Sequence, residues 1–339
     1  MLPAGAELLL GQAGLAGAVP ESLAGDASAR RYWRLRQAGR TAILGHSPGP
    51  DGSDECRRFV AVGVWLAERG FSAPRILAAD TGAGLMLVED LGDDLVARLC
   101  ETAPEMEAEI YLATAGMLAD LACHDPPGFV RPLDGPALGA LMSVLPDAYV
   151  PAMGGDRAAA AGIGTIVAAL WSDCGAGDDV VLSLRDFHAE NLIWLPGRQG
   201  SARLGLLDFQ DAVAAHPLYD VVSLLQDARR DVSPEMADLI RDAAIARLGP
   251  DRDRLALAFA LLGAQRALRI AGVFVRLSVD RGRVGYLDLL PRVWRNLRRN
   301  LDHPGLEGLR ALVLDALPAP EPALIERVRQ ECRSRPTPS

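Results

Sequence analysis

Three polar side chains follow two apolar segments of the sequence. The first segment, residues 180–184, leads into Asp186, and Asn191 comes five residues later; the second segment leads into Asp208. A carboxylate on a loop that leaves a buried strand can accept the proton of an attacking hydroxyl within about 3 Å. Amide and carboxylate oxygens are the hard ligands that Mg²⁺ prefers. The pattern therefore predicts one base, Asp186, and two metal ligands, Asn191 and Asp208, in a phosphoryl-transfer site.

A simple turn is the structural alternative for part of this pattern. Asp186 and Asn191 could do no more than hydrogen-bond a loop, and for an isolated Asp-x4-Asn pair that interpretation is the better one. Here Asp208 ends a second apolar segment after a hairpin-like interval. The three residues together favour the phosphoryl-transfer site over the turn.

The composition describes a large globular protein with an acidic charge balance. Half of the 339 residues are apolar, which is enough for a sizeable core and predicts more than one domain. The formal net charge is -9, whereas a dedicated nucleic-acid binder needs a basic surface. The five cysteines are scattered without a Cys-x2-Cys pair, so we expect neither a zinc site nor a disulfide framework.

The expected location follows from targeting signals. The N-terminus has no basic segment ahead of its apolar residues, which is not typical of a signal peptide. No uninterrupted apolar stretch reaches the roughly 18 residues of a membrane-spanning helix. We expect a cytoplasmic protein with no membrane and no nucleic-acid partner. The sequence does not indicate an oligomeric state.

The sequence contains no lysine, and all 35 basic residues are arginine. The load of alanine, glycine and proline favours a GC-rich genome as the cause. Whatever the cause, no lysine can act in catalysis or bind phosphate here. Any anionic substrate must be held by arginine or by backbone N–H groups.

The first 88 residues are predicted to form a five-stranded, mostly antiparallel sheet with one long helix. Alternating apolar and polar residues favour strands there. Ser53 or Asp54 is the candidate N-cap of a helix over residues 55–69, which ends at Gly70. The strands that we expect cover residues 32–36, 41–44, 75–79 and 85–88, and residues 5–16 are compatible with a helix.

The sequence becomes mainly helical after an acidic link at residues 89–94. Ser233 is a candidate N-cap, with Pro234 in the first helical position. Residues 333–339 are expected to be a frayed tail. The predicted helices cover residues 104–122, 156–173, 219–230, 234–249, 252–277 and 286–301.

A sheet, an acidic link and a helical part, in this order, resemble the bilobal protein-kinase-like fold of the α+β class. Residues 184–192 (LRDFHAENL) resemble the catalytic loop of aminoglycoside phosphotransferases and related small-molecule kinases, and residues 207–212 (LDFQDA) are similar to their metal-binding segment. The resemblance implies an enzyme that uses ATP and Mg²⁺ to phosphorylate a small alcohol. It implies an N-terminal lobe (1–88), a hinge (89–92) and a C-terminal lobe (93–332).

Within this family, the sequence is most similar to the bacterial anomeric kinases of cell-wall sugar recycling. These enzymes phosphorylate C1 of N-acetylmuramic acid and N-acetylglucosamine. The finer resemblance implies a small sugar acceptor and a role in peptidoglycan recycling. It is carried by residues 25–32 (GDASARRY), 207–212, 219–225 (YDVVSLL) and 265–277.

Two positions depart from the family pattern. Leu184 stands where the family usually has an architectural histidine, two residues before the base. The third strand has no phosphate-binding lysine, so Glu55 on the following helix lacks its expected partner. We interpret Glu55 as a helix-start acid that the helix dipole favours.

Another group must therefore neutralise the phosphates of the nucleotide. We hypothesise that the turn at residues 25–28 and one arginine among Arg30, Arg31 and Arg34 take the place of the lysine. The equal alternative is that these arginines form a solvated strand face. Residues 89–91 would offer backbone groups to adenine, as in the family. The residues expected at the nucleotide are Gly25, Ser28, Ala29, Arg30, Arg31, Glu89 and Leu91.

The acceptor pocket is expected near the two motifs and on one later helix. His188 either contacts the substrate or braces the loop. Arg266 could meet a lactyl carboxylate, although an exposed helix face is the simpler interpretation. Asp220 is expected to anchor the catalytic loop from the helix behind it. The substrate-binding candidates are His188, Glu190, Gln210, Asp211 and Arg266.

Three other functions compete with an anomeric sugar kinase. The same reaction could act on an aminoglycoside, choline or homoserine. A pseudokinase scaffold would explain the missing lysine, but it would need neither a base nor both metal ligands. A metal-dependent hydrolase would need more histidine or carboxylate ligands than this site offers.

Overall fold

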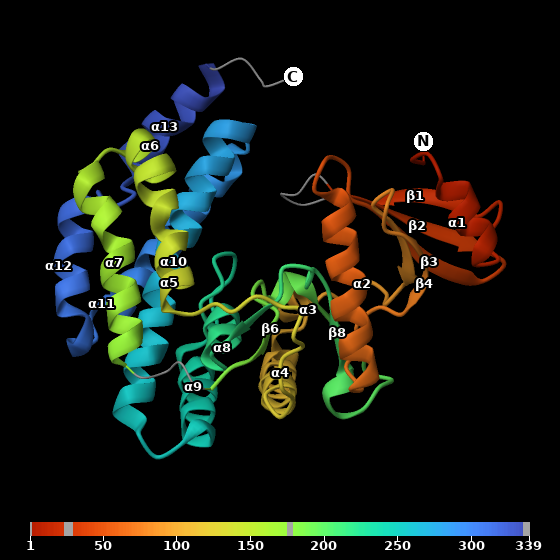
Figure 1. Ribbon diagram of the computed structural model, residues 1–339, viewed down its shortest axis with the longest axis horizontal. Helices are drawn as coiled ribbons and strands as arrows, with labels where there is room; N and C mark the ends of the chain where they lie inside the picture. The colour runs from red at the N-terminus through yellow and green to blue at the C-terminus, as the bar shows by residue number, and fades with distance from the viewer. Residues whose placement is uncertain (1, 24–29, 175–178, 335–339) are drawn as a thin grey trace. The chain divides into compact units, whose positions relative to one another are not determined.

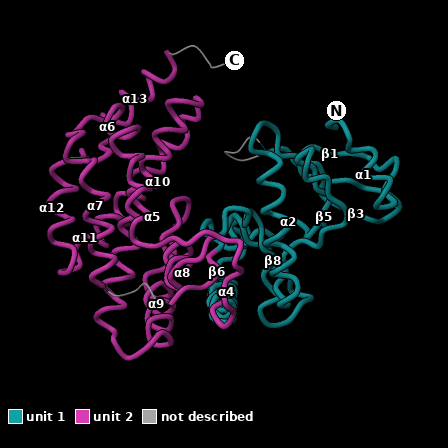
Figure 2. Tube along the Cα trace, viewed as in Figure 1, with its two compact units in different colours: residues 1–121, 184–212 teal, residues 122–183, 213–339 magenta. Residues whose placement is uncertain are grey.

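The computed structural model describes residues 2–23, 30–174 and 179–334, and these divide into two compact units. The first unit contains Met1–Leu121 and Leu184–Ala212, and the second contains Ala122–Ser183 and Val213–Ser339 (Figure 2). The segment with both motifs therefore packs with the N-terminal part of the chain. The predicted lobes, with boundaries at residues 88 and 92, are functional parts of the protein and differ from these compact units. They stay a prediction.

The first unit contains the predicted antiparallel sheet of five strands, in the order β1-β2-β3-β5-β4 (Figure 1). Four strands lie where the alternation predicts them. The edge strand β1 was missed, because its residues are mostly exposed and show no alternation of burial. The strands are β1 Val19–Leu23, β2 Arg31–Gln37, β3 Arg40–His46, β4 Ile76–Asp80 and β5 Leu85–Glu89.

Two helices pack on this sheet. Helix α1 (Ala6–Gln12) buries Leu9 and Leu10 against a cluster that includes Trp33 and Leu35 of β2. Helix α2 (Gly52–Glu68) contacts β5 through Cys56, whose Sγ donates to the carbonyl oxygen of Leu85 at 3.4 Å. The sheet is thus covered by apolar side chains from both helices, which is how a sheet of this kind buries its faces.

The predicted N-cap of α2 is wrong. The helix begins at Gly52, and the cap position is Asp51, without a capping hydrogen bond from its side chain. A turn in which the Gly52 N–H donates to Gly49 at 3.2 Å leads directly into the helix. A Cβ atom at Gly52 would lie 1.9 Å from the carbonyl oxygen of Ser47, so only glycine fits this close approach.

The first unit continues with α3 (Val96–Thr102), α4 (Glu107–Leu121) and a short antiparallel pair, β7 (Leu192–Trp194) and β8 (Leu204–Leu206). This pair is attached to the N-terminal part by backbone hydrogen bonds. The Leu206 N–H donates to the Ser72 carbonyl at 3.0 Å, and the Trp194 N–H donates to the Asp94 carbonyl at 2.8 Å. These bonds explain why the motif segment belongs to the first unit.

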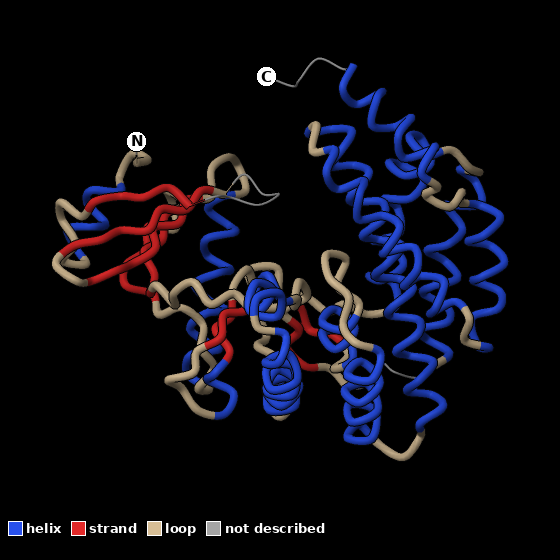
Figure 3. Tube along the Cα trace, turned by 180° about the vertical axis from the view of Figure 1, so that it is seen from behind, coloured by secondary structure: helices blue, strands red, loops and turns tan. Residues whose placement is uncertain are grey.

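The second unit is almost entirely helical (Figure 3). It adds one short antiparallel pair, β6 (Val181–Ser183) and β9 (Val213–Ala215). The class is therefore α+β, as predicted, with the sheet in the N-terminal part and helices in the C-terminal part. The helices are α5 Gly135–Ala140, α6 Val150–Met153, α7 Arg157–Asp173, α8 Leu218–Leu225, α9 Pro234–Leu248, α10 Arg252–Arg281, α11 Leu290–Leu301, α12 Glu307–Ala316 and α13 Pro322–Ser334.

Helix α10 is the central helix of this unit. Among the helices that the structure describes, it is the one with the length and apolar content to cross a membrane, yet 83% of its most apolar window is buried inside the protein. It packs against α8 and α11. Its apolar composition is therefore that of a core helix, as the leucine and alanine content indicates.

Helix α8 is shorter than predicted and ends at Leu225 rather than at Arg230. The next two side chains make hydrogen bonds that compete with a helix. The Gln226 Nε2 donates to Asn300 Oδ1 at 3.0 Å, and the Asp227 carboxylate accepts from the Arg229 N–H at 2.8 Å. Asp227 thus forms a local turn of the kind that ends helices. The predicted Ser233 cap of α9 is confirmed, because its Oγ accepts from the Met236 N–H.

His216 is buried between β9 and α8. Its ring meets the edge of Trp171 at a centroid distance of 5.6 Å, and its Nδ1 accepts from the Leu218 N–H at 3.2 Å. Burial lowers the pKa of His216 from 6.5 to about 4. The folded protein therefore contains His216 in its neutral form at pH 7.

We predict that His216 makes the protein less stable in mild acid. Between pH 6.5 and 4 the unfolded chain binds a proton at His216 that the folded chain does not accept. The stabilisation is complete above the unfolded pKa and is lost as the pH falls towards the folded pKa, by about 2–3 kcal/mol. Urea denaturation at pH 7 and 4.5 should show a smaller loss for His216→Asn than for the wild type. Equal losses would contradict the assignment.

Candidate active site

The loop after β6 presents Asp186. Arg185 adopts a left-handed conformation with φ of 69°, and the Asp186 N–H donates to the Leu184 carbonyl at 2.8 Å. The Nδ2 of Asn191 donates to the Asp186 carbonyl at 2.8 Å and closes the loop. The five-residue spacing thus brings Asn191 back beside Asp186, as predicted.

The β7–β8 pair brings the third residue of the motif to the same place. The Leu207 N–H donates to the Asn191 carbonyl at 2.9 Å, which extends the pairing by one step beyond the strands. Asp208 follows immediately. Asn191 and Asp208 therefore lie at the same end of one short ladder, so that an amide oxygen and a carboxylate are available together.

Backbone strain is concentrated at this site. Within the described residues, three non-glycine residues have positive φ, and two of them are Arg185 and Asp208, with φ of 69° and 57°. Each costs on the order of 1 kcal/mol, and such strain persists where the surroundings over-determine it. The conformation of each residue redirects the chain where a motif strand ends. The strain is typical of a functional site.

The Asp208 carboxylate already has a cationic partner, Arg30. The Nη1 of Arg30 lies 2.5 Å from Asp208 Oδ1, and the two side chains are 12% and 33% exposed. Burial lowers the pKa of Arg30, but Tyr32 and Asp208 outweigh it and raise that pKa overall. Gln210 Nε2 donates to Asp208 Oδ1 at 3.1 Å. The carboxylate therefore accepts a cation, which is what a metal ligand must do.

Helix α2 supports the segment that follows Asp208. The rings of Phe59 and Phe209 stack at a centroid distance of 4.5 Å. Arg58 Nε donates to the carbonyl of Gln210 at 3.1 Å, and its Nη2 lies 3.7 Å from Asp211. Sequence reasoning did not connect Arg58 with the site, because a charged side chain on a helix gives no local pattern that names a distant partner. Asp211 is half-exposed and remains available to other partners.

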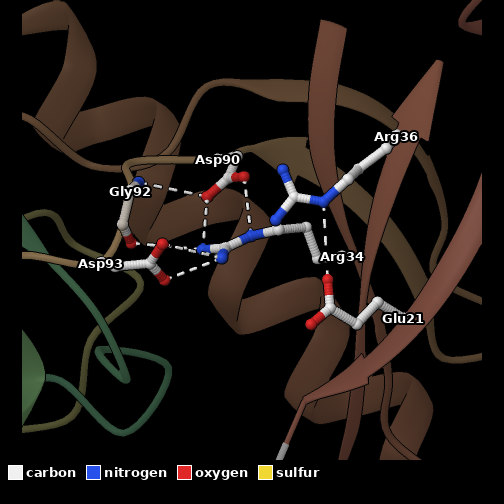
Figure 4. Close-up of polar contacts among 6 residues, drawn as sticks. All are labelled: Glu21, Arg34, Arg36, Asp90, Gly92 and Asp93. Atoms are coloured by element: carbon white, nitrogen blue, oxygen red, sulfur yellow. Dashed lines mark hydrogen bonds and ion pairs between the residues drawn. The ribbon is translucent and has the colours of Figure 1, made fainter. Parts of the chain in front are cut away.

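The predicted hinge is held by Arg34 of β2. The sequence analysis considered this arginine for phosphate binding or for a solvated strand face. Its Nε lies 2.9 Å from Asp90 Oδ2, and its Nη1 lies 2.7 Å from Asp93 Oδ1. In Figure 4, its guanidinium points at both carboxylates, whereas Arg36 meets Glu21. Burial lowers the pKa of Arg34, but its hydrogen bond with Asp93 and the charge of Asp90 raise that pKa overall. Arg34 therefore fixes the link and is not on a solvated face.

The other hinge residues are also held in place. Glu89 pairs with Arg198 at 2.7 Å and is part-buried. Leu91 lies against β8, where a Cβ atom at Gly205 would come within 2.9 Å of its Cδ1. Glycine at this position lets the hinge leucine pack onto the strand.

Two predicted substrate residues, His188 and Glu190, lie within the predicted catalytic loop. His188 is 8% exposed, and its Nε2 lies 3.5 Å from Asn191 Nδ2. This contact is what the bracing interpretation of His188 requires. Glu190 is part-buried in the short turn that precedes β7. A role of either residue in substrate binding stays a prediction.

The remaining predicted residues lie elsewhere. Arg266 of α10 is 4% exposed, with its guanidinium 5.7 Å from the ring centre of Tyr219, so it is not on an exposed helix face. Arg31 is exposed at the start of β2. Asp220 of α8 accepts from Ser183 Oγ at 2.7 Å, which confirms the predicted anchor behind the loop. The predicted nucleotide residues Gly25, Ser28 and Ala29 lie outside the described residues.

These features define a phosphotransferase with a kinase-like fold. The phosphotransferase enzyme family matches residues 20–258, and the chain belongs to this family. It is therefore an enzyme, and the family implies ATP as the phosphoryl donor. Relatives named N-acetylmuramate/N-acetylglucosamine kinase include one from Caulobacter vibrioides, 40% identical over 86% of this chain and 90% of that protein, and one from Pseudomonas putida, 29% identical over 86% of each.

Solved structures of related enzymes share the fold. A choline/ethanolamine kinase family protein from Mesorhizobium loti has a TM-score of 0.59 and 16% identity, and covers 95% of this chain and 97% of its own. The aminoglycoside phosphotransferase APH(3'')-Id from Streptomyces rimosus has a TM-score of 0.50 and 20% identity, and covers 79% of this chain and 99% of its own. The predicted protein-kinase-like fold is therefore confirmed.

We predict that Arg34 stabilises the first unit far more than its neighbour Arg36. Arg34→Ala leaves Asp90, whose side chain is 7% exposed, without its cation, which should cost about 3 kcal/mol. Arg36→Ala is the matched control, because its pair with Glu21 is 3.5 Å long and about half exposed, and should cost at most about 0.5 kcal/mol. Urea denaturation measures both. Equal losses would contradict the clamp.

Proposed function

We propose that the protein transfers the γ-phosphate of ATP to the anomeric C1 hydroxyl of N-acetylmuramate or N-acetylglucosamine, in the recycling of cell-wall sugars. The observation that carries the proposal is the 40% identity with the Caulobacter vibrioides kinase over 86% of this chain, together with the juxtaposition of Asp186, Asn191 and Asp208. An anomeric hydroxyl is more acidic than an ordinary alcohol, so one carboxylate base is enough.

Asp186 would take the proton of the acceptor hydroxyl as the phosphoryl group arrives. Its loop is closed by Asn191 and anchored through Ser183 to Asp220, so the base is pre-positioned. Asn191 and Asp208 would hold Mg²⁺, which neutralises charge on the transferred phosphoryl group. The ion pair of Asp208 with Arg30 supports this role, because it marks a carboxylate that attracts a cation.

The nucleotide would lie along the sheet. Glu89 and Leu91 frame the hinge, whose backbone groups would meet adenine, and Arg34 keeps this link in one conformation. The turn at residues 25–29 and the arginines after it would meet the phosphates. On this proposal, residues 1–88 act as the nucleotide-covering lobe and residues 93–332 as the catalytic lobe.

The acceptor would be bound by residues that flank the base. His188, Glu190, Gln210 and Asp211 are the candidates in the first unit. Arg266, the candidate for a lactyl carboxylate, belongs to the second unit, where it lines a small cavity with Gln226 and Asn296. We place the enzyme in the cytoplasm, where ATP and recycled sugars meet, without a nucleic-acid or membrane partner.

The acceptor is tested by ADP release from ATP and magnesium across a panel. The panel contains N-acetylmuramate, N-acetylglucosamine, glucose, galactose, kanamycin, choline and homoserine. We expect turnover with the two N-acetylated amino sugars and a product that carries phosphate at C1. Turnover with kanamycin or an amino alcohol, and with no sugar, would overturn the proposed acceptor. ATP binding without turnover on any acceptor would favour a scaffold.

Replacement of the base separates chemistry from binding. Asp186→Ala should lower kcat by about 10³-fold or more, because the acceptor proton loses its acceptor. Nucleotide affinity should change little, since the base acts on the acceptor hydroxyl and not on the nucleotide. Isothermal titration with ATP and a coupled ADP assay measure the two effects. A fully active variant would show that another group is the base.

A further inference from the structure

Arg30 lies among the charged groups that a phosphate-binding lysine would otherwise serve. It pairs with Asp208, its side chain is 12% exposed, and the charge of Glu55 on α2 also acts on it. Tyr32 is the other close neighbour. The chain contains no lysine, and Arg30 is a cation that pairs with the predicted metal ligand Asp208.

We propose that Arg30 is an exchangeable counter-ion of the metal site: it holds Asp208 while the nucleotide is absent and moves to the nucleotide phosphates when the metal–nucleotide complex binds. The proposal rests on the proposed function and deepens it, because it specifies how the phosphates are bound without lysine. It also changes our interpretation of Glu55, because the negative charge of Glu55 acts on Arg30.

The geometry suits an exchange rather than a permanent pair. The Asp208 side chain is 33% exposed, so a second cation can reach it from solvent. Gln210 also donates to Asp208 Oδ1 at 3.1 Å, so the carboxylate stays oriented when one partner leaves. The guanidinium presents several donors in a plane, which suits phosphate oxygens as well as a carboxylate.

The charges favour the movement of Arg30 away from Asp208 only when the metal ion and the nucleotide bind together. Free Mg²⁺ must displace Arg30 from Asp208 and leaves that guanidinium without its anion. The metal–nucleotide complex brings a replacement anion for Arg30 at the same moment. Arg30 should therefore weaken the binding of the free metal and strengthen the binding of the metal–nucleotide complex. A purely structural ion pair would not act in opposite directions.

The test compares Arg30→Gln with Arg36→Gln, an exposed arginine of the same strand region that pairs with Glu21. Free Mn²⁺ binding is measured by electron paramagnetic resonance without nucleotide, and binding of ATP with Mg²⁺ by isothermal titration. Neither measurement contains a sugar. We expect Arg30→Gln to bind free Mn²⁺ about 3–5-fold more tightly and the metal–nucleotide complex about 10–100-fold more weakly. Arg36→Gln should match the wild type in both.

Either half of this result can overturn the proposal. Unchanged or weaker Mn²⁺ binding by Arg30→Gln would show that Arg30 does not compete for Asp208. Unchanged nucleotide binding would show that Arg30 does not move to the phosphates. If Arg30→Gln does not fold, Arg30→Lys takes its place. Lysine keeps the positive charge, so this variant should retain most of the affinity for the metal–nucleotide complex. A loss of affinity of about 10–100-fold in Arg30→Lys would overturn the proposal. A wrong sugar acceptor would leave all these binding results unchanged.

Discussion

The short ladder between β7 and β8 is the constraint on which the site depends. One hydrogen bond beyond its end, from the Leu207 N–H to the Asn191 carbonyl, sets Asn191 beside Asp208. A second, from Asn191 Nδ2 to the Asp186 carbonyl, sets Asp186, the proposed base, beside the amide. Asn191 thus makes both connections. The ladder is attached to Ser72, in the segment between α2 and β4, which explains why the motif segment and the sheet belong to the same compact unit.

All basic residues of this protein are arginine, and two arginines that lie close together in the sequence, Arg30 and Arg34, have different roles. Arg34 is 7% exposed and bound to Asp90 and Asp93, so removal would leave a buried carboxylate unpaired. Arg30 pairs with a carboxylate that solvent can reach. The first pair is structural and the second is open to exchange. Burial of the acidic partner, rather than the distance between the charges, makes this difference.

The strained residues Arg185 and Asp208 show how the fold serves the chemistry. Both adopt left-handed conformations where a motif strand ends, and both are held by hydrogen bonds of their neighbours. The residue after Asp208, Phe209, stacks on Phe59, which supports the chain next to Asp208. If Asp208 holds a metal as proposed, its carboxylate is already in position before the metal arrives, which is the advantage of a pre-organised site.

The sequence by itself predicted the sheet, most helices and the juxtaposition of Asp186, Asn191 and Asp208, because period-two alternation, caps and a five-residue loop are local. It did not predict the end of α8, where a side-chain turn at Asp227 competes with the helix, or the start of α2, where Gly52 approaches Ser47. Only the tertiary structure decided the partners of the arginines. Arg30 and Arg34 look alike in sequence, but their pairing depends on carboxylates that lie 56 residues or more away along the chain, and long-range contacts of this kind leave no local pattern.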